Sequence, residues 1–151
     1  MTDEDEASDV QEPDFRLDRT AWGMVEEADE TVESLSVAEL RAELDAGESI
    51  PVDIRDIREV WIEGSIPDAE HAPRGMIEFW ADPGTEYYKS FFDPANRYVL
   101  YCNEGGRSAL AARDLRAMGY PDVAHLDGGF TAWQAADAPM VDVPQKDYKG
   151  R

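Results

Sequence analysis

The sequence has little positive charge, a single cysteine and no long apolar run. Its 14 lysine and arginine residues stand against 34 aspartate and glutamate residues, a formal net charge of −20. Such a surface repels phosphate backbones and anionic membranes, so we expect no nucleic-acid and no membrane partner. No stretch approaches the roughly 20 apolar residues of a membrane-spanning helix. The one cysteine, Cys102, excludes an intramolecular disulfide and a cysteine-based zinc cluster.

Length and composition are those of one folded domain with an acidic extension. The chain has 151 residues, 42% of them hydrophobic, which suffices for a single core of ordinary size. Residues 1–14 hold seven acids and no base, which predicts a disordered arm. The start lacks the positive and apolar segments of a signal peptide, so we expect a cytoplasmic protein. Residues 15–30 are predicted as a helical extension, 31–140 as the domain and 141–151 as a flexible tail.

Strand and helix patterns alternate through the domain. Ser36 and Glu39 have the spacing of a capping box, which starts a helix over 37–46. Short apolar runs indicate strands, and amphipathic stretches bounded by glycine and proline indicate helices. We expect an α/β fold in which a central parallel sheet of about five strands has helices on both faces. The predicted strands are 31–33, 50–54, 69–72, 98–101 and 123–126; the predicted helices include 20–28, 59–63, 107–118 and one between 129 and Pro139.

The chemistry of the sequence is concentrated at Cys102. This residue ends the strongest strand pattern and is followed by Gly105, Gly106 and a predicted helix. In a parallel α/β sheet this position lies at the carboxyl edge, where ligands bind. Backbone N–H groups of residues 103–107 and the positive end of the helix stabilise a thiolate there, and Arg107 adds a cation that binds oxyanions. The pattern therefore predicts a reactive thiolate; the alternative is a small buried cysteine that ends a core strand.

This loop resembles the active-site loop Cys-x-x-Gly-x-Arg-Ser of the rhodanese-like sulfurtransferases. Residues 52–59 are similar to the Asp-x-Arg…Glu segment of that family, residues 64–73 to Gly-His-Ile-Pro-Gly-Ala-x-x-x-Pro, and residues 119–133 to the closing Leu-x-Gly-Gly-x-x-x-Trp. The resemblance covers about residues 31–140. It departs from the family at Ser65, where histidine is usual, and at Asp68, where glycine is usual. The loop itself reads Cys102-Asn103-Glu104-Gly105-Gly106-Arg107-Ser108.

The resemblance implies a rhodanese fold and a sulfurtransferase without a cofactor. Cys102 would take a sulfane sulfur from thiosulfate or a persulfide donor and pass it to cyanide, a thiol or a protein. The loop amides would stabilise the persulfide, and Arg107 would hold the sulfonate end of the donor. Ser108 would either donate a hydrogen bond to the thiolate or simply begin the helix.

Two other functions remain open from the sequence. One is a carrier that relays persulfide sulfur between proteins, and the other is a non-catalytic binding or regulatory module with the same fold. Phosphatases of this fold place five residues between cysteine and arginine, whereas four separate Cys102 from Arg107. A tighter loop suits a sulfane sulfur better than a tetrahedral phosphate, so we do not expect a phosphatase.

Several further polar residues have a structural and a functional interpretation. Arg55 and Glu59, four residues apart after a strand, are predicted to bond to each other and fix the turn, and Asp53 to orient the active-site loop. Arg74 either adds positive field to the pocket or is a solvated loop residue. Glu104 is harmless to an anion site if it faces solvent and disfavours thiosulfate if it faces inward.

The histidines and a group of aromatic residues complete the list of candidates. His71 and His125 are far apart in the sequence, so we expect structural roles for both and no metal site. The aromatic side chains are interpreted either as core and lid packing or as a substrate-pocket wall. They are Phe79, Trp80, Tyr87, Tyr88, Phe91 and Phe92.

Overall fold

The fold is a parallel sheet between two layers of helices. The computed structural model describes residues 13–146, so residues 1–12 of the predicted arm and 147–151 of the predicted tail lie outside the described residues. Within this range five strands form one sheet in the order β1-β5-β4-β2-β3, and every neighbouring pair is parallel. The predicted α/β sheet is therefore confirmed. The strands are β1 (Glu33–Leu35), β2 (Ile50–Asp53), β3 (Glu70–His71), β4 (Tyr98–Tyr101) and β5 (Val123–Leu126).

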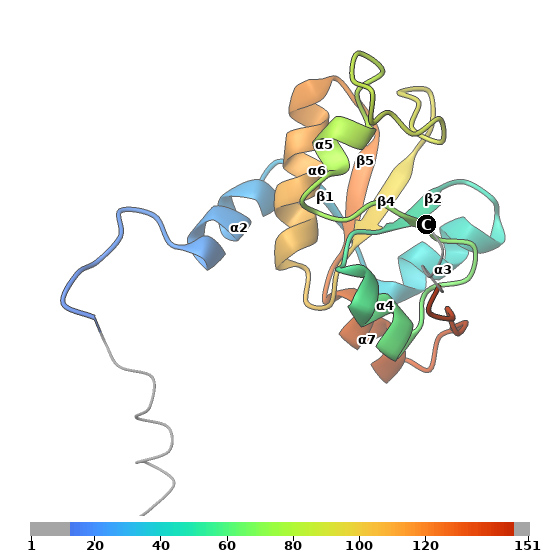
Figure 1. Cartoon of the computed structure of the whole chain (residues 1–151). Helices are drawn as coiled ribbons and strands as arrows, with labels where there is room; N and C mark the ends of the chain where they lie inside the picture. The colour runs from blue at the N-terminus through green and yellow to red at the C-terminus, as the bar shows by residue number, and fades with distance from the viewer. Residues whose placement is uncertain (1–12, 147–151) are drawn as a thin grey trace, which may run out of the picture.

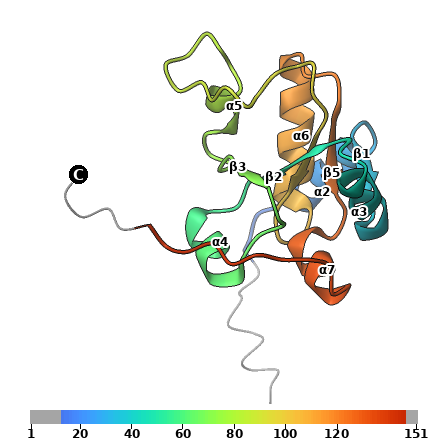
Figure 2. The ribbon, with the colours of Figure 1, turned by 90° about the vertical axis from the view of Figure 1, so that its right-hand side faces the viewer.

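Alternation along the central strand β4 divides the core into two parts. Leu100 faces one layer and packs with Ala111 and Leu115 of one helix, while Val99 faces the other and packs with Leu40 and Trp133. Figure 2 shows α4 and α7 at one end of the sheet and α5 towards the other. The helices are α2 (Ala21–Asp29), α3 (Val37–Asp45), α4 (Ile57–Glu63), α5 (Ile77–Trp80), α6 (Gly106–Met118) and α7 (Gly129–Ala135).

The N-terminal extension is helical and lies against the domain. Helix α2 runs beside α6 (Figure 1), where Val25 and Ala28 pack on Ala109. The predicted edge strand over 31–33 was placed too early, because the amides of Thr31 and Val32 still donate to the carbonyl of Ala28 and finish the helix. The strand begins at Glu33 and pairs with β5. The predicted capping box of Ser36 and Glu39 is present at the start of α3.

The turn over residues 64–73, which departs from the family pattern at Ser65 and Asp68, is held by the backbone conformation of Asp68 and the hydrogen bonds of Ser65. Asp68 adopts a left-handed conformation with φ of 64°, which aspartate tolerates better than most side chains. The Ser65 hydroxyl lies 3.0 Å from the Tyr101 hydroxyl and donates to the Ile66 carbonyl. Ser65 also exchanges two backbone hydrogen bonds with Val141, so the first residue of the predicted flexible tail is held against the domain.

Two turns at the carboxyl edge of the sheet pack directly against each other. Gly129 has φ of 58°, and a Cβ atom on it would stand 2.5 Å from the carbonyl oxygen of Cys102. The same oxygen accepts a 2.7 Å hydrogen bond from the amide of Phe130. Only glycine fits here, because any side chain would push the turn after β5 away from the turn after β4.

We expect Gly129→Ala to lower the free energy of unfolding by about 3–4 kcal/mol, from left-handed strain and overpacking together. Gly47→Ala is a matched control, since Gly47 also has positive φ (69°) but meets nothing within 4 Å. It should lose only about 1–2 kcal/mol. Urea unfolding of both variants measures the difference. Equal losses would show that the contact with Cys102 is not tight.

Candidate active site

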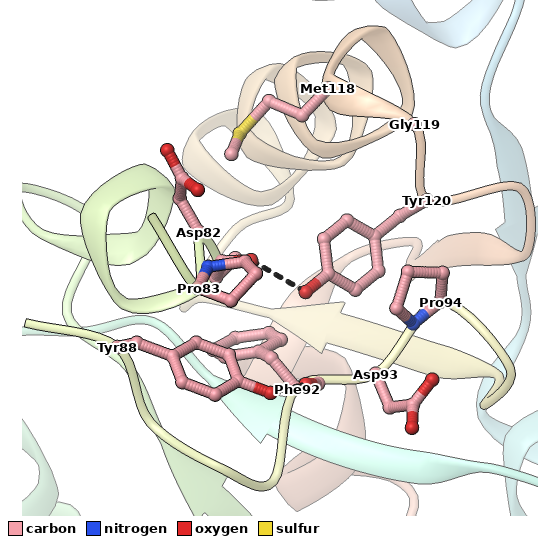
Figure 3. A pocket seen from close by; sticks show the side chains of 10 residues that line it. Asp82, Pro83, Tyr88, Phe92, Asp93, Pro94, Met118, Gly119 and Tyr120 are labelled. Carbon is pink, nitrogen blue, oxygen red and sulfur yellow. Dashed lines mark hydrogen bonds between the residues drawn. The ribbon is translucent and has the colours of Figure 1, made fainter. Parts of the chain in front are cut away.

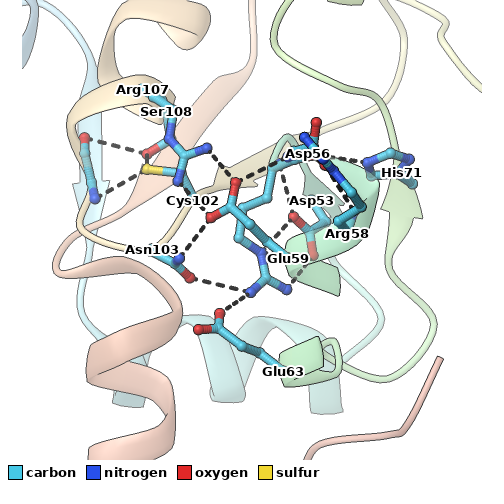
Figure 4. Close-up of polar contacts among 12 residues, drawn as sticks. Asp53, Asp56, Arg58, Glu59, Glu63, His71, Cys102, Asn103, Arg107 and Ser108 are labelled. Carbon is cyan, nitrogen blue, oxygen red and sulfur yellow. Dashed lines mark hydrogen bonds and ion pairs between the residues drawn. The ribbon is translucent and has the colours of Figure 1, made fainter. Parts of the chain in front are cut away.

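Cys102 follows β4 directly and lies beneath the start of α6. Its side chain is buried, and Sγ accepts a 3.1 Å hydrogen bond from the amide of Gly105. Gly105 has φ of 96° as the residue before the helix, and this left-handed conformation turns its N–H back towards the sulfur. Of the amides of residues 103–107, the Gly105 amide is the one that donates to Sγ. Figure 4 shows the sulfur among Asn103, Arg107 and Ser108.

Arg107 and Glu59 form a bidentate ion pair at the edge of this site. The guanidinium donates to both Glu59 oxygens, at 2.8 and 3.1 Å, and Asn103 Nδ2 donates to Glu59 at 2.8 Å (Figure 4). The hydrogen bond from Arg107 lowers the pKa of Glu59, so this carboxylate stays ionised near neutral pH. The pKa of Arg107 is raised, first by Glu59 and to a lesser extent by the nearby Cys102 sulfur. Arg107 thus lies beside the Cys102 thiol, and the Glu59 carboxylate compensates the positive charge of Arg107.

The predicted bond between Arg55 and Glu59 was wrong. Arg55 is fully buried, and its guanidinium donates to Asp53 at 2.7 Å, to the carbonyl of Gly64 at 2.7 Å and to Glu63 at 2.8 Å. Asp53 is equally buried and two residues away, so it is the stronger partner in a medium of low dielectric constant. Glu59 instead pairs with an arginine 48 positions later in the chain.

Asp53 reaches the active-site loop through Arg55. Arg55 Nη1 lies 3.2 Å from Asn103 Oδ1, and the guanidinium carbon lies 4.3 Å from the centre of the Phe130 ring. The pair therefore braces both turns at the carboxyl edge. His71 Nε2 is 2.7 Å from the carbonyl of Arg55, a contact that supports a structural role for this histidine.

Arg74 and Glu104 lie away from the sulfur. Arg74 pairs with Glu78 at 3.0 Å and with Asp114 at 2.9 Å. Asp114 is eight residues into α6, which puts this ion pair about 12 Å along the helix from its start. The side chain of Glu104 is exposed, so the solvent-facing interpretation of this residue applies.

Ser108 and His125 form a contact that sequence reasoning missed. Ser108 Oγ lies 3.6 Å from Cys102 Sγ and 3.0 Å from His125 Nδ1, and both side chains are buried. The sequence predicts a structural role for His125, because the two histidines are far apart and each lies beside apolar residues. A histidine inside an otherwise apolar strand was the available signal.

The aromatic side chains of residues 79–92 do not surround Cys102. Phe92 packs in the core against Tyr98 and Tyr120, with ring centres 5.4 and 6.0 Å apart. A hollow of about 480 Å³ lies beside them (Figure 3), and Met118 at the last turn of α6 is one of its lining residues. Cys102 lies at the first turn of that helix, so about 18 Å of helix separates the two sites. This favours the interpretation as core and lid packing.

Among residues 13–146, no helix is both long and apolar enough to cross a membrane. No group of three or more histidine, cysteine, aspartate or glutamate side chains in the same residues is arranged to hold a metal ion.

Comparison with known proteins decides the family. The profile of the rhodanese-like domain matches residues 36–136, more than half of the chain. The chain belongs to the rhodanese-like domain family. Helix α2 lies outside the part that this rhodanese profile matches.

Similar proteins agree with this assignment. Thiosulfate sulfurtransferase GlpE of Pseudoalteromonas translucida is 32% identical over 72% of this rhodanese-like chain and 94% of its own length. The probable adenylyltransferase/sulfurtransferase MoeZ of Mycobacterium tuberculosis is 35% identical over 66% of this chain but only 24% of its own. A solved structure from Rhodopseudomonas palustris CGA009, described as a protein of unknown function and possible tyrosine phosphatase, has a TM-score of 0.80 and 39% identity. It covers 86% of this chain and 100% of its own. At the level of the family, the matches support a rhodanese-type sulfurtransferase.

We expect Arg55→Ala to lower the free energy of unfolding of this rhodanese-like domain by about 3–5 kcal/mol, because it leaves the buried Asp53 carboxylate unpaired. Arg74→Ala removes an arginine whose side chain is 30% exposed and also has two acidic partners. This control should lose no more than about 1 kcal/mol. Urea unfolding at pH 7 compares them, and similar losses would contradict the central role of Arg55.

Proposed function

We propose that this protein is a sulfurtransferase that carries a sulfane sulfur on Cys102 as a persulfide. The observation that carries the proposal is the position of Cys102 Sγ, bonded to the Gly105 amide at the start of α6 and beside Arg107. A thiolate formed there faces a helix N-terminus and a permanent cation, and both stabilise negative charge. The 32% identity to thiosulfate sulfurtransferase GlpE supports the same chemistry.

The transfer takes place in two displacement steps. The Cys102 thiolate attacks the outer sulfur of thiosulfate, the bond between the two thiosulfate sulfurs breaks, and sulfite leaves with the electron pair. Cyanide or a thiolate acceptor then attacks the outer sulfur of the persulfide, and the Cys102 thiolate is released. No oxidant or reductant is consumed, and no cofactor takes part in either step.

Each loop residue has a role in this scheme. The amides of Asn103, Glu104, Gly105, Gly106 and Arg107 stabilise the anionic outer sulfur in the way an oxyanion hole stabilises charge. The Arg107 guanidinium attracts the anionic end of the donor. Ser108 touches Sγ and donates to the thiolate. Arg55, paired with Asp53, donates to the Asn103 side chain and so holds it in place. Arg74 pairs with Glu78 and Asp114 and has no part in the transfer.

The Arg107–Glu59 ion pair sets the preference for donors. A dianion such as thiosulfate must compete with the Glu59 carboxylate for the same two N–H donors. A persulfide donor carries less charge and does not need them. The donor is therefore thiosulfate or a persulfide, and the acceptor is a small nucleophile or a protein thiol.

We expect Glu59→Gln to lower KM for thiosulfate about fivefold, since removing the competing charge is worth about 1 kcal/mol at a partly exposed site. Glu63→Gln is the control, because Glu63 is a carboxylate of the same helix that bonds to Arg55 instead. Steady-state rates against thiosulfate concentration give both values. An unchanged or raised KM in Glu59→Gln alone would contradict this competition.

A phosphatase is the second candidate, because the similar structure from Rhodopseudomonas palustris is described as a possible tyrosine phosphatase. Four residues separate Cys102 from Arg107, one fewer than phosphatases of this fold use. The shorter loop leaves less room for a tetrahedral phosphate. Hydrolysis of para-nitrophenyl phosphate that disappears in Cys102→Ser would favour the phosphatase.

Intact-mass measurement tests the sulfurtransferase directly. Incubation with thiosulfate should add one sulfur, about 32 Da, that cyanide removes and that Cys102→Ser never acquires. The single cysteine makes the assignment unambiguous. Labelling by a persulfide donor but not by thiosulfate would favour the protein-to-protein carrier. No labelling by either donor would leave the non-catalytic module and refute the proposal.

A further inference from the structure

A line of buried polar groups connects Cys102 to the N-terminal helix α2. Cys102 Sγ lies 3.6 Å from Ser108 Oγ, and Ser108 Oγ lies 3.0 Å from His125 Nδ1. On the other side of the ring, His125 Nε2 lies 2.7 Å from Asp29 Oδ1. His125 is 1% exposed, while the Asp29 side chain is 42% exposed at the end of α2. The line thus runs from the nucleophile to a carboxylate at the surface.

The topology of the sheet explains how these groups meet. Strands β4 and β5 are parallel neighbours, with His125 opposite Leu100, whose side chain faces α6. Paired residues of neighbouring strands point to the same face, so His125 also faces α6, near Ser108 in its first turn. Ser34 of β1 is opposite His125, and its hydroxyl lies 3.0 Å from Nε2. Helix α2 ends at Asp29, four positions before β1 begins at Glu33, and this short connection brings Asp29 to the same place.

The carboxylate defines the proton positions along the line. An ionised Asp29 is an acceptor only, so His125 Nε2 carries a hydrogen and donates to it. In the neutral ring Nδ1 is then an acceptor. The Ser108 hydroxyl lies 3.3 Å from the Gly105 carbonyl oxygen and 3.0 Å from Nδ1, and it donates to the nearer Nδ1. The Ser108 oxygen retains lone pairs that accept from the Cys102 thiol. Every donor in the line Cys102–Ser108–His125–Asp29 therefore points away from the sulfur.

We propose that this line is a proton relay that generates the Cys102 thiolate. The thiol proton moves to Ser108 Oγ while the serine proton moves to His125 Nδ1, which leaves a thiolate and an imidazolium. Ser108 then donates its new proton to the sulfur, and Asp29 compensates the buried imidazolium. Ser108 touches the reacting atom, whereas His125 and Asp29 are positioning residues that act through it. The relay deepens the proposed sulfur transfer and rests on it for its role.

Helix α2 is thereby part of the active site. Besides carrying Asp29, it places the ring of Trp22 at 3.1 Å from where a Cβ on Gly106 would stand, so the indole covers the active-site loop. Val25 and Ala28 hold the helix on Ala109, one residue after Ser108. None of these α2 residues lies within residues 36–136, the part matched by the family profile.

Other charged groups also act on the sulfur and must be distinguished from the relay. Arg107 also lies near the sulfur and is paired with Glu59. Both keep one charge state near neutral pH, since their pairing raises the pKa of Arg107 and lowers the pKa of Glu59. A change in the reaction of Cys102 in variants of His125 or Asp29 therefore reports on the line Cys102–Ser108–His125–Asp29 and not on Arg107 or Glu59.

The test is the rate at which iodoacetamide alkylates Cys102 between about pH 5 and pH 10. Alkylation reports the thiolate and needs neither thiosulfate nor an acceptor. We expect Asp29→Asn and His125→Asn to react about tenfold or more slowly near neutral pH, with profiles displaced towards higher pH. All proteins should reach the same rate at the alkaline end, where hydroxide ionises the thiol without help. Asp29→Glu, which restores the carboxylate, should recover most of the neutral-pH rate.

Asp45→Asn is the matched control. Asp45 is the last residue of the nine-residue helix α3, as Asp29 is the last residue of the nine-residue helix α2. Its profile should equal that of the wild type. Profiles of Asp29→Asn and Asp45→Asn that coincide would overturn the relay, and so would a loss in Asp29→Asn that is equal at every pH. Because Asp29 is partly exposed, this variant tests the idea even if His125→Asn fails to fold.

The sulfur-transfer proposal fails in a different way. A wild type that acquires no persulfide but shows the displaced alkylation profiles in the variants would support the relay and reject sulfur transfer. A wild type that acquires the persulfide, with unchanged profiles in Asp29→Asn and His125→Asn, would support sulfur transfer and reject the relay.

Discussion

The buried guanidinium of Arg55 is the interaction on which the arrangement of the site depends. It bonds to Asp53 at the end of β2, to Glu63 and the Gly64 carbonyl at the end of α4, and to Asn103 in the active-site loop. A buried charge is stable only when its donors are satisfied, so these segments are held in one geometry. The glycine contact between Gly129 and Cys102 closes the same region from the other side. The Gly105 amide that donates to the sulfur is therefore positioned before any ligand arrives.

The electrostatic potential close to Cys102 is opposite in sign to the one that the net charge of the protein produces at long range. The chain carries a net charge of −20, which repels anionic donors at long range. Close to the sulfur, the helix N-terminus, the Gly105 amide and Arg107 reverse the sign. Glu59 limits this reversal, because it already accepts two hydrogen bonds from Arg107. Selectivity among donors consequently depends on contacts within a few ångströms and less on steering from solution.

The folded domain includes the N-terminal helix α2 and therefore begins before the part that the family profile matches. Composition alone suggested an extension attached to the domain, yet α2 packs on α6 and ends at the carboxylate that bonds to His125. A general base that acts through a serine on a cysteine resembles other activated nucleophiles, in which a third group orients the base. Here that third group comes from outside the family's common core.

The sequence by itself determined the α/β alternation, the order of its strands and helices, the capping of α3 and the loop around Cys102. These features depend on local patterns, namely periodicity, glycine positions and residue spacing, which the chain carries wherever it folds. Tertiary structure alone decided which charges meet. Glu59 pairs with Arg107, 48 residues away, and not with Arg55. His125 lies within hydrogen-bond distance of Ser108, 17 residues away, and of Asp29, 96 residues away. Such pairs form because strands distant in sequence become neighbours in one sheet, and burial then selects the partners that satisfy each polar group.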